Sequence, residues 1–288
     1  MNRRFAAVLV PLLVLPLAAC GAKTGATADA AATPADPKQA LVASTTGVKA
    51  GNYSFTVTSP DSIDVKGVVH IPSRSASVDM AIEEDGNKGL MQFRIVEPDR
   101  YVKMKMDLGQ SAAQLKQMEQ MAAENPSLKK TVAALKAMVE LFSGKNWMHV
   151  DMSKLKGDDL QISIDNPDLV GVGALTDGVV TAQRTATGIG GTLDVTQVKG
   201  DDQMFSESAF KGLAAEKAKA LPYEATLDAE GRLTAFVLDV PKFADTPAGK
   251  WKVAFTGYGA ASKQEAPPAA EVKEMTADGY KVLNGEQA

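Results

Sequence analysis

The sequence predicts an α+β fold built on a large antiparallel β-sheet. Between residues 52 and 108, apolar residues alternate with polar ones, as in Tyr53, Phe55 and Val57, which is typical of half-buried strands. The middle of the chain repeats apolar residues at helical spacing, and the last third returns to strand patterns. Strands joined by short turns and interrupted by helices favour a single α+β domain.

The first part of the chain should form a meander with one apolar and one polar face, because its strands follow one another with short turns. The turns fall at 84–87 and 97–99, both rich in Asp, Asn, Gly or Pro. The expected strands cover 53–57, 63–71, 78–82, 91–95 and 102–108.

Two amphipathic helices are expected at 110–124 and 126–142. In the second, apolar residues recur at helical spacing from Leu128 to Phe142, and Asn125-Pro126 supplies an N-cap and a proline at the first helical position. The remaining expected strands are 147–151, 179–184, 191–198, 223–227, 233–240 and 251–255, and the remaining helices are 38–48, 169–175 and 207–220.

The first twenty residues have the pattern of an export signal. Arg3 and Arg4 precede an apolar run of roughly 15 residues, shorter than the about 20 that a membrane-spanning helix needs. The run ends in Leu-Ala-Ala before Cys20, which resembles the bacterial lipobox, so Cys20 would be acylated and become the first mature residue. A plain signal peptide or a short anchor is the alternative.

These patterns divide the chain into four parts. Residues 1–19 are the expected lipoprotein signal peptide, and residues 20–37 are the lipidated cysteine and a flexible tether of Gly, Ala, Thr, Pro and Asp. Residues 38–262 form a single domain, and residues 263–288 a polar C-terminal tail with at most a helical turn. Since Cys20 is the only cysteine, no internal disulfide can form.

Composition and motifs argue against several functions. The net charge of −4 and the lack of a basic block disfavour nucleic-acid binding. The hydrolase patterns G-x-S-x-G and H-E-x-x-H are absent, and the S-x-x-K matches at Ser127 and Ser208 lack the partner motifs of a penicillin-binding site. The glycine clusters lack a nucleotide-binding context. We therefore expect no enzyme activity and no cofactor.

The twelve methionines leave three interpretations open. An exported Met/His cluster could bind Cu(I), which soft thioether ligands select, and the candidates are Met104 and Met106, Met118 and Met121, and His149 between Met148 and Met152. Alternatively, methionine fills an ordinary core, or it lines a cavity adapted to lipid, because it is flexible and polarizable.

Several short segments together resemble a known family. The chain is similar to the actinobacterial lipoproteins of the LppX/LprG type, relatives in fold of the lipoprotein carriers LolA and LolB. The matching features, in order, are the lipobox at Cys20 and segments 99–102, 147–151, 190–194, 227–233, 257–259 and 266–272.

The resemblance implies a strongly curved antiparallel sheet, a half-barrel, with helices covering its concave face and an apolar cavity between them. Family members bind or carry lipids, lipoglycans or glycolipids, but no headgroup motif is present. The candidate cavity residues therefore come from strand and helix periodicity alone: Phe55, Met80, Met91, Phe93, Ile95, Val102, Met104, Met106, Leu115, Met118 and Phe236.

The expected protein is thus a lipid-anchored monomer at the outer face of the cell membrane, with a lipid or glycolipid as its ligand and an envelope transporter as a further partner. Its alternative is a structural or accessory envelope lipoprotein with a packed core. The third hypothesis is an exported Cu(I)-binding protein.

Overall fold

A computed structural model describes residues 36–84, 87–109, 111–156, 162–199, 204–206 and 208–286. Thr33–Ala288 form one compact unit, which contains the whole described core. Cys20 and the expected signal peptide lie outside the described residues.

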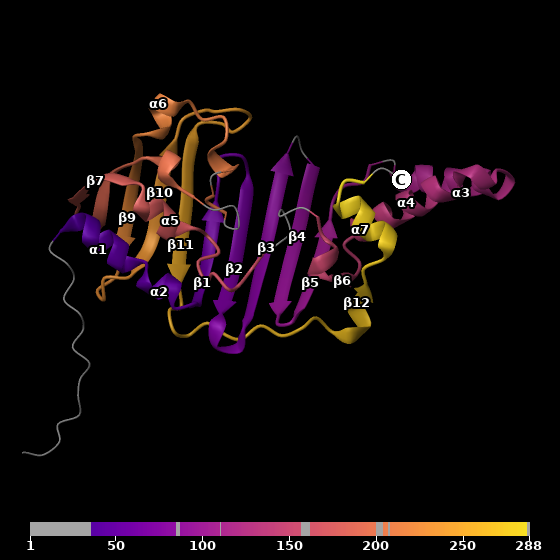
Figure 1. The fold of residues 1–288 in the computed structure, drawn as a ribbon, viewed down its shortest axis with the longest axis horizontal. Coiled ribbons are helices and arrows are strands. Elements are labelled where there is room, and N and C mark those ends of the chain that lie inside the picture. Colours follow the sequence, from indigo (N-terminus) through magenta and orange to yellow (C-terminus); the bar gives the residue numbers. More distant parts are fainter. Residues whose placement is uncertain are drawn as a thin grey trace, which may run out of the picture. The chain divides into compact units, whose positions relative to one another are not determined.

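One twelve-stranded sheet dominates this unit (Figure 1). Its strand order is β12-β6-β5-β4-β3-β2-β1-β11-β10-β9-β8-β7, and every neighbouring pair is antiparallel except β12 and β6. The strands are β1 Asn52–Thr58, β2 Ile63–His70, β3 Ser75–Glu84, β4 Asn87–Val96, β5 Asp99–Lys105, β6 Trp147–His149, β7 Val179–Arg184, β8 Gly188–Leu193, β9 Leu221–Leu227, β10 Leu233–Val240, β11 Gly249–Thr256 and β12 Val272–Glu274. The expected α+β class and large antiparallel sheet are confirmed.

Helices lie along the β7–β1 half of the sheet and at its opposite end, beyond β6 (Figure 1). They are α1 Pro37–Ser44, α2 Thr46–Lys49, α3 Ser111–Glu124, α4 Lys129–Leu141, α5 Val172–Asp177, α6 Ala215–Ala218 and α7 Ala277–Leu283. Helix α1 packs against β7 and α5, and α2 against β1. Helices α3 and α4 form a hairpin at the opposite end, beyond β6 in Figure 1, and α7 packs on α4. No helix of the described residues is long and apolar enough to cross a membrane.

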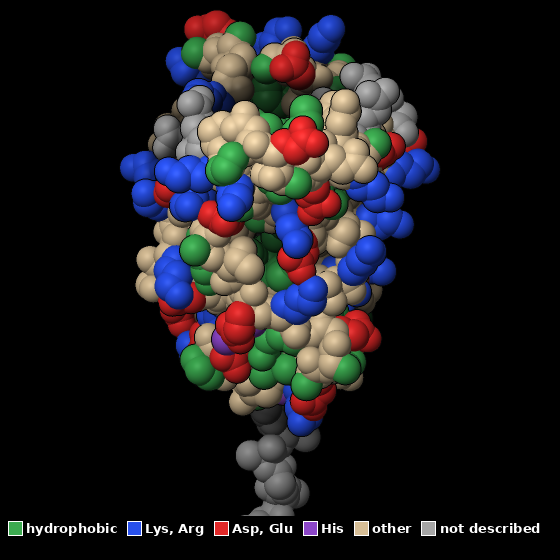
Figure 2. Space-filling model, turned by 90° about the vertical axis from the view of Figure 1, so that its right-hand side faces the viewer, with side chains coloured by type: hydrophobic (Ala, Val, Ile, Leu, Met, Phe, Trp, Pro, Cys, Tyr) green, Lys and Arg blue, Asp and Glu red, His purple; other side chains and the backbone are tan. Residues whose placement is uncertain are grey.

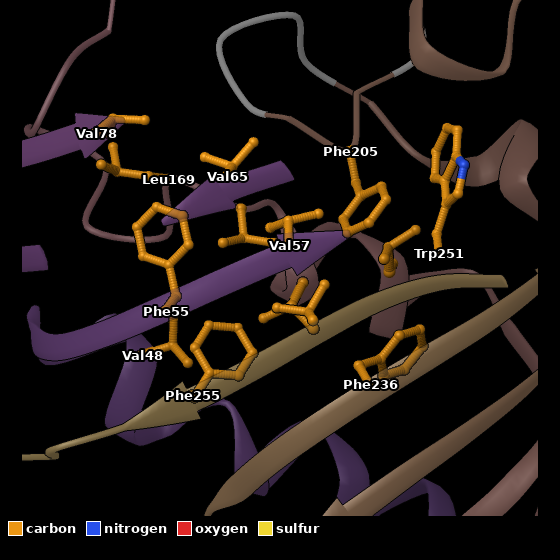
Figure 3. Packing of buried hydrophobic residues seen from close by; sticks show 14 of the residues in the cluster. Val48, Phe55, Val57, Val65, Val78, Leu169, Phe205, Phe236, Trp251 and Phe255 are labelled. Atoms are coloured by element: carbon orange, nitrogen blue, oxygen red, sulfur yellow. The ribbon is translucent and has the colours of Figure 1, made fainter. Parts of the chain in front are cut away.

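The half of the sheet around β1, β10 and β11 has a tightly packed core (Figure 3). Phe55 on β1 and Phe255 on β11 are register partners and lie side by side. Phe205, from the connection between β8 and β9, stacks on Trp251 with ring centroids 5.2 Å apart. The buried carboxylate of Asp168 caps the start of α5 by accepting hydrogen bonds from three successive backbone N–H groups, at residues 171–173.

The segment after β11 is a structured strap, where the sequence suggested a polar tail. It runs along one end of the strands in Figure 1, where Asn52 and Ser75 accept hydrogen bonds from its backbone. It then adds β12 to the edge of the sheet and ends in α7, whose N-cap is Thr276. A strand of three residues carries too little periodicity to be recognised from the sequence.

Two further elements differ from expectation. The helix expected at 207–220 is replaced by a 3-10 turn at Ser208–Phe210 and the short α6, because Gly212 between them has a left-handed backbone (φ 92°). The strand expected to reach Val198 ends at Leu193, because the Asp194 side chain caps a 3-10 turn by accepting from the Thr196 N–H.

Candidate functional site

A continuous apolar row crosses seven neighbouring strands on one face of the sheet. Each member is the register partner of the next, so the side chains stand next to one another. The row reads Phe236, Val253, Val57, Val65, Met80, Met91 and Met104 from β10 to β5. Its last three members are here called the methionine end. The alternation in the sequence thus identified which side chains share this face.

A second row runs beside the first and contains three more of the predicted residues, Phe55, Phe93 and Val102. It reads Phe255, Phe55, Gly67, Val78, Phe93, Val102 and Met148 from β11 to β6. The glycine is required by packing, because a Cβ at Gly67 would lie only 2.3 Å from the ring of Phe55. The predicted Ile95 is buried on the same face, one step further along β4.

The cover over the apolar row is uneven. From Phe236 to Val65 every side chain is buried, and Met104 is only 3 % exposed. Between them, Met80 and Met91 are half-buried and pack against the core from its margin. Within the apolar row, Met80 and Met91 are therefore the least covered members.

A pocket of about 290 Å³ adjoins the methionine end. Met91, Met106 and Ile82 supply its apolar lining, and Asn87, Lys88, Gly89 and Asp107 supply polar groups. This volume is near the lower end of the range of about 300–1,000 Å³ for ligand pockets. A second cavity, next to Phe93, Ile95 and Val102, measures only about 20 Å³, room for little more than a water molecule.

The structure brings most, but not all, of the predicted cavity residues together. Met106 follows the end of β5, is 47 % exposed and reaches the pocket from its rim. Leu115 and Met118 lie on α3, are half-buried, and do not pack against the core of the sheet. Phe236 is buried far along the row, where its ring stacks on Tyr223 at 5.4 Å. Ile82 was not among the predicted residues, although it shares the alternation of Met80.

The copper candidates do not converge. Met104 faces the core while Met106 is exposed beyond the strand end. Met148 and His149 are neighbours on β6, so their side chains point to opposite faces of the sheet. Both ring nitrogens of His149 face carboxylates, Nδ1 at 2.9 Å from Glu274 and Nε2 at 3.2 Å from Asp99. Within the described part of the chain, no three His, Cys, Asp or Glu side chains form a metal-binding group.

The His149 contacts join three strands at the sheet edge, because Asp99 is on β5 and Glu274 on β12. Although partial burial opposes the charged form, the hydrogen bonds and charges of Glu274 and Asp99 raise the pKa of His149. Protonation of the imidazole therefore strengthens the attachment of the C-terminal strap to the sheet.

At the end of the molecule that carries α3 and α4, charges of both signs are interspersed and hydrophobic side chains form small separate patches (Figure 2). Comparison of the chain with protein-family models gives no match, and neither does comparison with curated proteins.

Proposed function

We propose that this protein is a membrane-anchored lipoprotein that binds or transfers a lipid or glycolipid at the outer face of the cell membrane. The acyl chain would lie at the methionine end of the apolar row. We also propose that the sheet is a strongly curved half-barrel, with its apolar face on the concave side and helices over it. Acylated Cys20 would hold the domain at the bilayer through residues 20–37.

The observation that carries this proposal is the incomplete cover over Met80 and Met91 beside the pocket at Met106. Each CH₂ of an acyl chain buried there contributes about 0.8 kcal/mol. Methionine suits such a site, since its unbranched thioether adapts to chains of different shape. Asn87 and Asp107 at the rim offer polar groups to a headgroup, whose identity the residues do not specify.

Native mass spectrometry of the full-length protein, extracted from its membrane in mild detergent, tests this proposal. Met80→Lys places a charge at the site, whereas Ala81→Lys places it on the adjacent, exposed and opposite-facing position of the same strand. We expect a bound lipid in the wild type and in Ala81→Lys. In Met80→Lys, loss of about two buried CH₂ groups alone lowers the affinity for the lipid by at least about tenfold, so occupancy should fall. Absence of lipid from the wild type, or equal loss in both variants, would refute the proposal.

A packed accessory lipoprotein is the second candidate, favoured by the burial of Phe205, Phe210 and Trp251 against one another over the other half of the sheet. It predicts a wild type free of lipid, a Met80→Lys variant with lowered unfolding stability, and a protein partner that co-purifies. Circular dichroism of the two lysine variants separates the candidates, because only the lipid-binding protein loses its ligand while keeping its fold.

A further inference from the structure

The hairpin of α3 and α4 has an apolar seam that the rest of the molecule leaves uncovered. Helix α3 packs chiefly against α4 and the 3-10 turn Pro126–Leu128 that joins them. Only the end of α4 is anchored, through buried Leu141 and contacts with β5 and α7. Ala122 is also buried, but the larger apolar residues of the hairpin before Leu141 are half-buried or exposed, and none of them packs against the core: Leu115, Met118, Met121, Leu128, Val132, Leu135, Met138 and Val139.

Although α3 packs on α4, these residues stay half-buried or exposed, so part of the apolar stripes remains open to a further surface. Met121 is 45 % exposed, and it is one of the few large hydrophobic side chains with that exposure in the described residues. The hairpin continues directly from β5, so Met106 and the pocket of the proposed lipid site lie at its base.

The charge of the hairpin points to the chemistry of its partner. Residues 111–145 contain five lysines and three glutamates, whereas the whole chain has a net charge of −4. Glu140 is paired with Lys273, at 2.5 Å, but Lys116, Lys129, Lys130 and Lys136 form no ion pair with a described residue. Lys129 and Lys136 lie seven residues apart on α4, beside the stripe that contains Val132 and Val139, and both are exposed.

We propose that the α3–α4 hairpin docks on an anionic lipid bilayer, with its apolar seam in the interface and its lysines against the headgroups. Lysines that flank an exposed apolar stripe are the pattern of a helix lying in a membrane surface, where their stems cover apolar area and their amines reach phosphate. Lys and Arg side chains border hydrophobic ones at this end of the molecule in Figure 2. This inference rests on the proposed function, since docking would place the lipid pocket against the membrane from which lipid is taken.

Flotation of residues 33–288 with vesicles tests the docking without the acyl anchor, because these residues form a compact unit with its own core. The probes are vesicles of phosphatidylglycerol and phosphatidylcholine and vesicles of phosphatidylcholine alone. We expect binding to the anionic vesicles that falls with added salt. Lys129→Glu with Lys136→Glu should weaken it by about 30-fold or more, given about 1 kcal/mol per lysine near an anionic surface. The matched control is Lys217→Glu with Lys219→Glu, two exposed lysines in α6 and at its C-cap, which should bind like the wild type.

Met121→Glu provides a second variant, since this exposed side chain contributes little to folding and should be needed for insertion. Absence of vesicle binding, or equal loss in the hairpin and α6 variants, would overturn the proposal. Self-association through the hairpin without vesicle binding, seen by sedimentation velocity, would also overturn it, in favour of a second copy as the covering surface. Lipid occupancy of the detergent-extracted protein is measured separately. Retained occupancy without vesicle binding refutes only the docking, whereas vesicle binding without occupancy refutes the proposed function.

Discussion

The contact between Gly67 and Phe55 makes Gly67→Ala a quantitative test of how the sheet face is packed. An added Cβ would lie 2.3 Å and 2.4 Å from two ring carbons of Phe55, and 2.9 Å from the carbonyl oxygen of Ser77. Phe55 is 2 % exposed and its ring packs 6.0 Å from that of Tyr53, so it has no free space to move into. Such overpacking costs about 1–3 kcal/mol of unfolding free energy.

Gly89 on β4 offers a matched control in the same sheet. Its nearest neighbours lie 3.8 Å or more from an added Cβ, so Gly89→Ala fits without displacement. Because alanine restricts the unfolded chain more than glycine does, this substitution should stabilise the protein by up to about 1 kcal/mol. Urea unfolding followed by circular dichroism gives both values from the shift in midpoint at constant slope.

A double-mutant cycle identifies the cause of the cost. If the clash is with the Phe55 ring, Phe55→Leu combined with Gly67→Ala should cost about 1 kcal/mol or more less than the sum of the single variants. Equal stability of Gly67→Ala and Gly89→Ala, or strict additivity in the cycle, would refute the packing described for this part of the sheet.

Three further predictions concern the polar contacts. The raised pKa of His149 means that its contribution to stability is complete below the ordinary histidine value of about 6.5 and is lost as pH rises through the folded value. In urea melts from pH 5 to 9, the wild type should therefore lose its advantage in unfolding free energy over His149→Gln as pH rises. The change should be less than about 1 kcal/mol, because the imidazole is partly exposed. A difference that stays constant with pH would contradict the His149 contacts. Asp168→Ala should lower the unfolding free energy by about 3 kcal/mol, because it leaves three buried N–H groups without an acceptor. The control Asp165→Ala, at an exposed position, should lower it by under about 1 kcal/mol. Equal losses in the two variants would argue against the cap. Trp251→Phe should lower the unfolding free energy by less than about 2 kcal/mol, because the buried Nε1 of Trp251 has no hydrogen-bond partner in the described structure. A larger loss in thermal melts would indicate that this N–H group does have a partner.

The alternation of residues in the early strands was enough to predict the apolar face. Val57, Val65 and Met80 fall on one side because side chains alternate in a strand, whatever the partner strands are. The alternation does not extend to Met106, because β5 ends at Lys105, although Met106 still lines the pocket.

The sequence could not show what covers an apolar stripe. The stripe through Leu115 and Met118 predicts an amphipathic helix correctly, but the place of that helix at the sheet edge depends on tertiary contacts. The C-terminal strap was missed for a related reason. Its attachment relies on single contacts, such as the hydroxyl of Tyr280 that accepts from the Asp151 N–H at 2.7 Å, and such contacts leave no periodic pattern.

The central claim, that a lipid chain lies at the methionine end of the sheet, is tested most directly by photo-cross-linking. The full-length protein in detergent would be incubated with a fatty acid that carries a diazirine near its tail, irradiated, digested and mapped by mass spectrometry. We predict label on the peptides that contain Met80, Met91 and Met106, which unlabelled fatty acid competes away. Label confined to other peptides, or label that unlabelled fatty acid does not reduce, would contradict the claim.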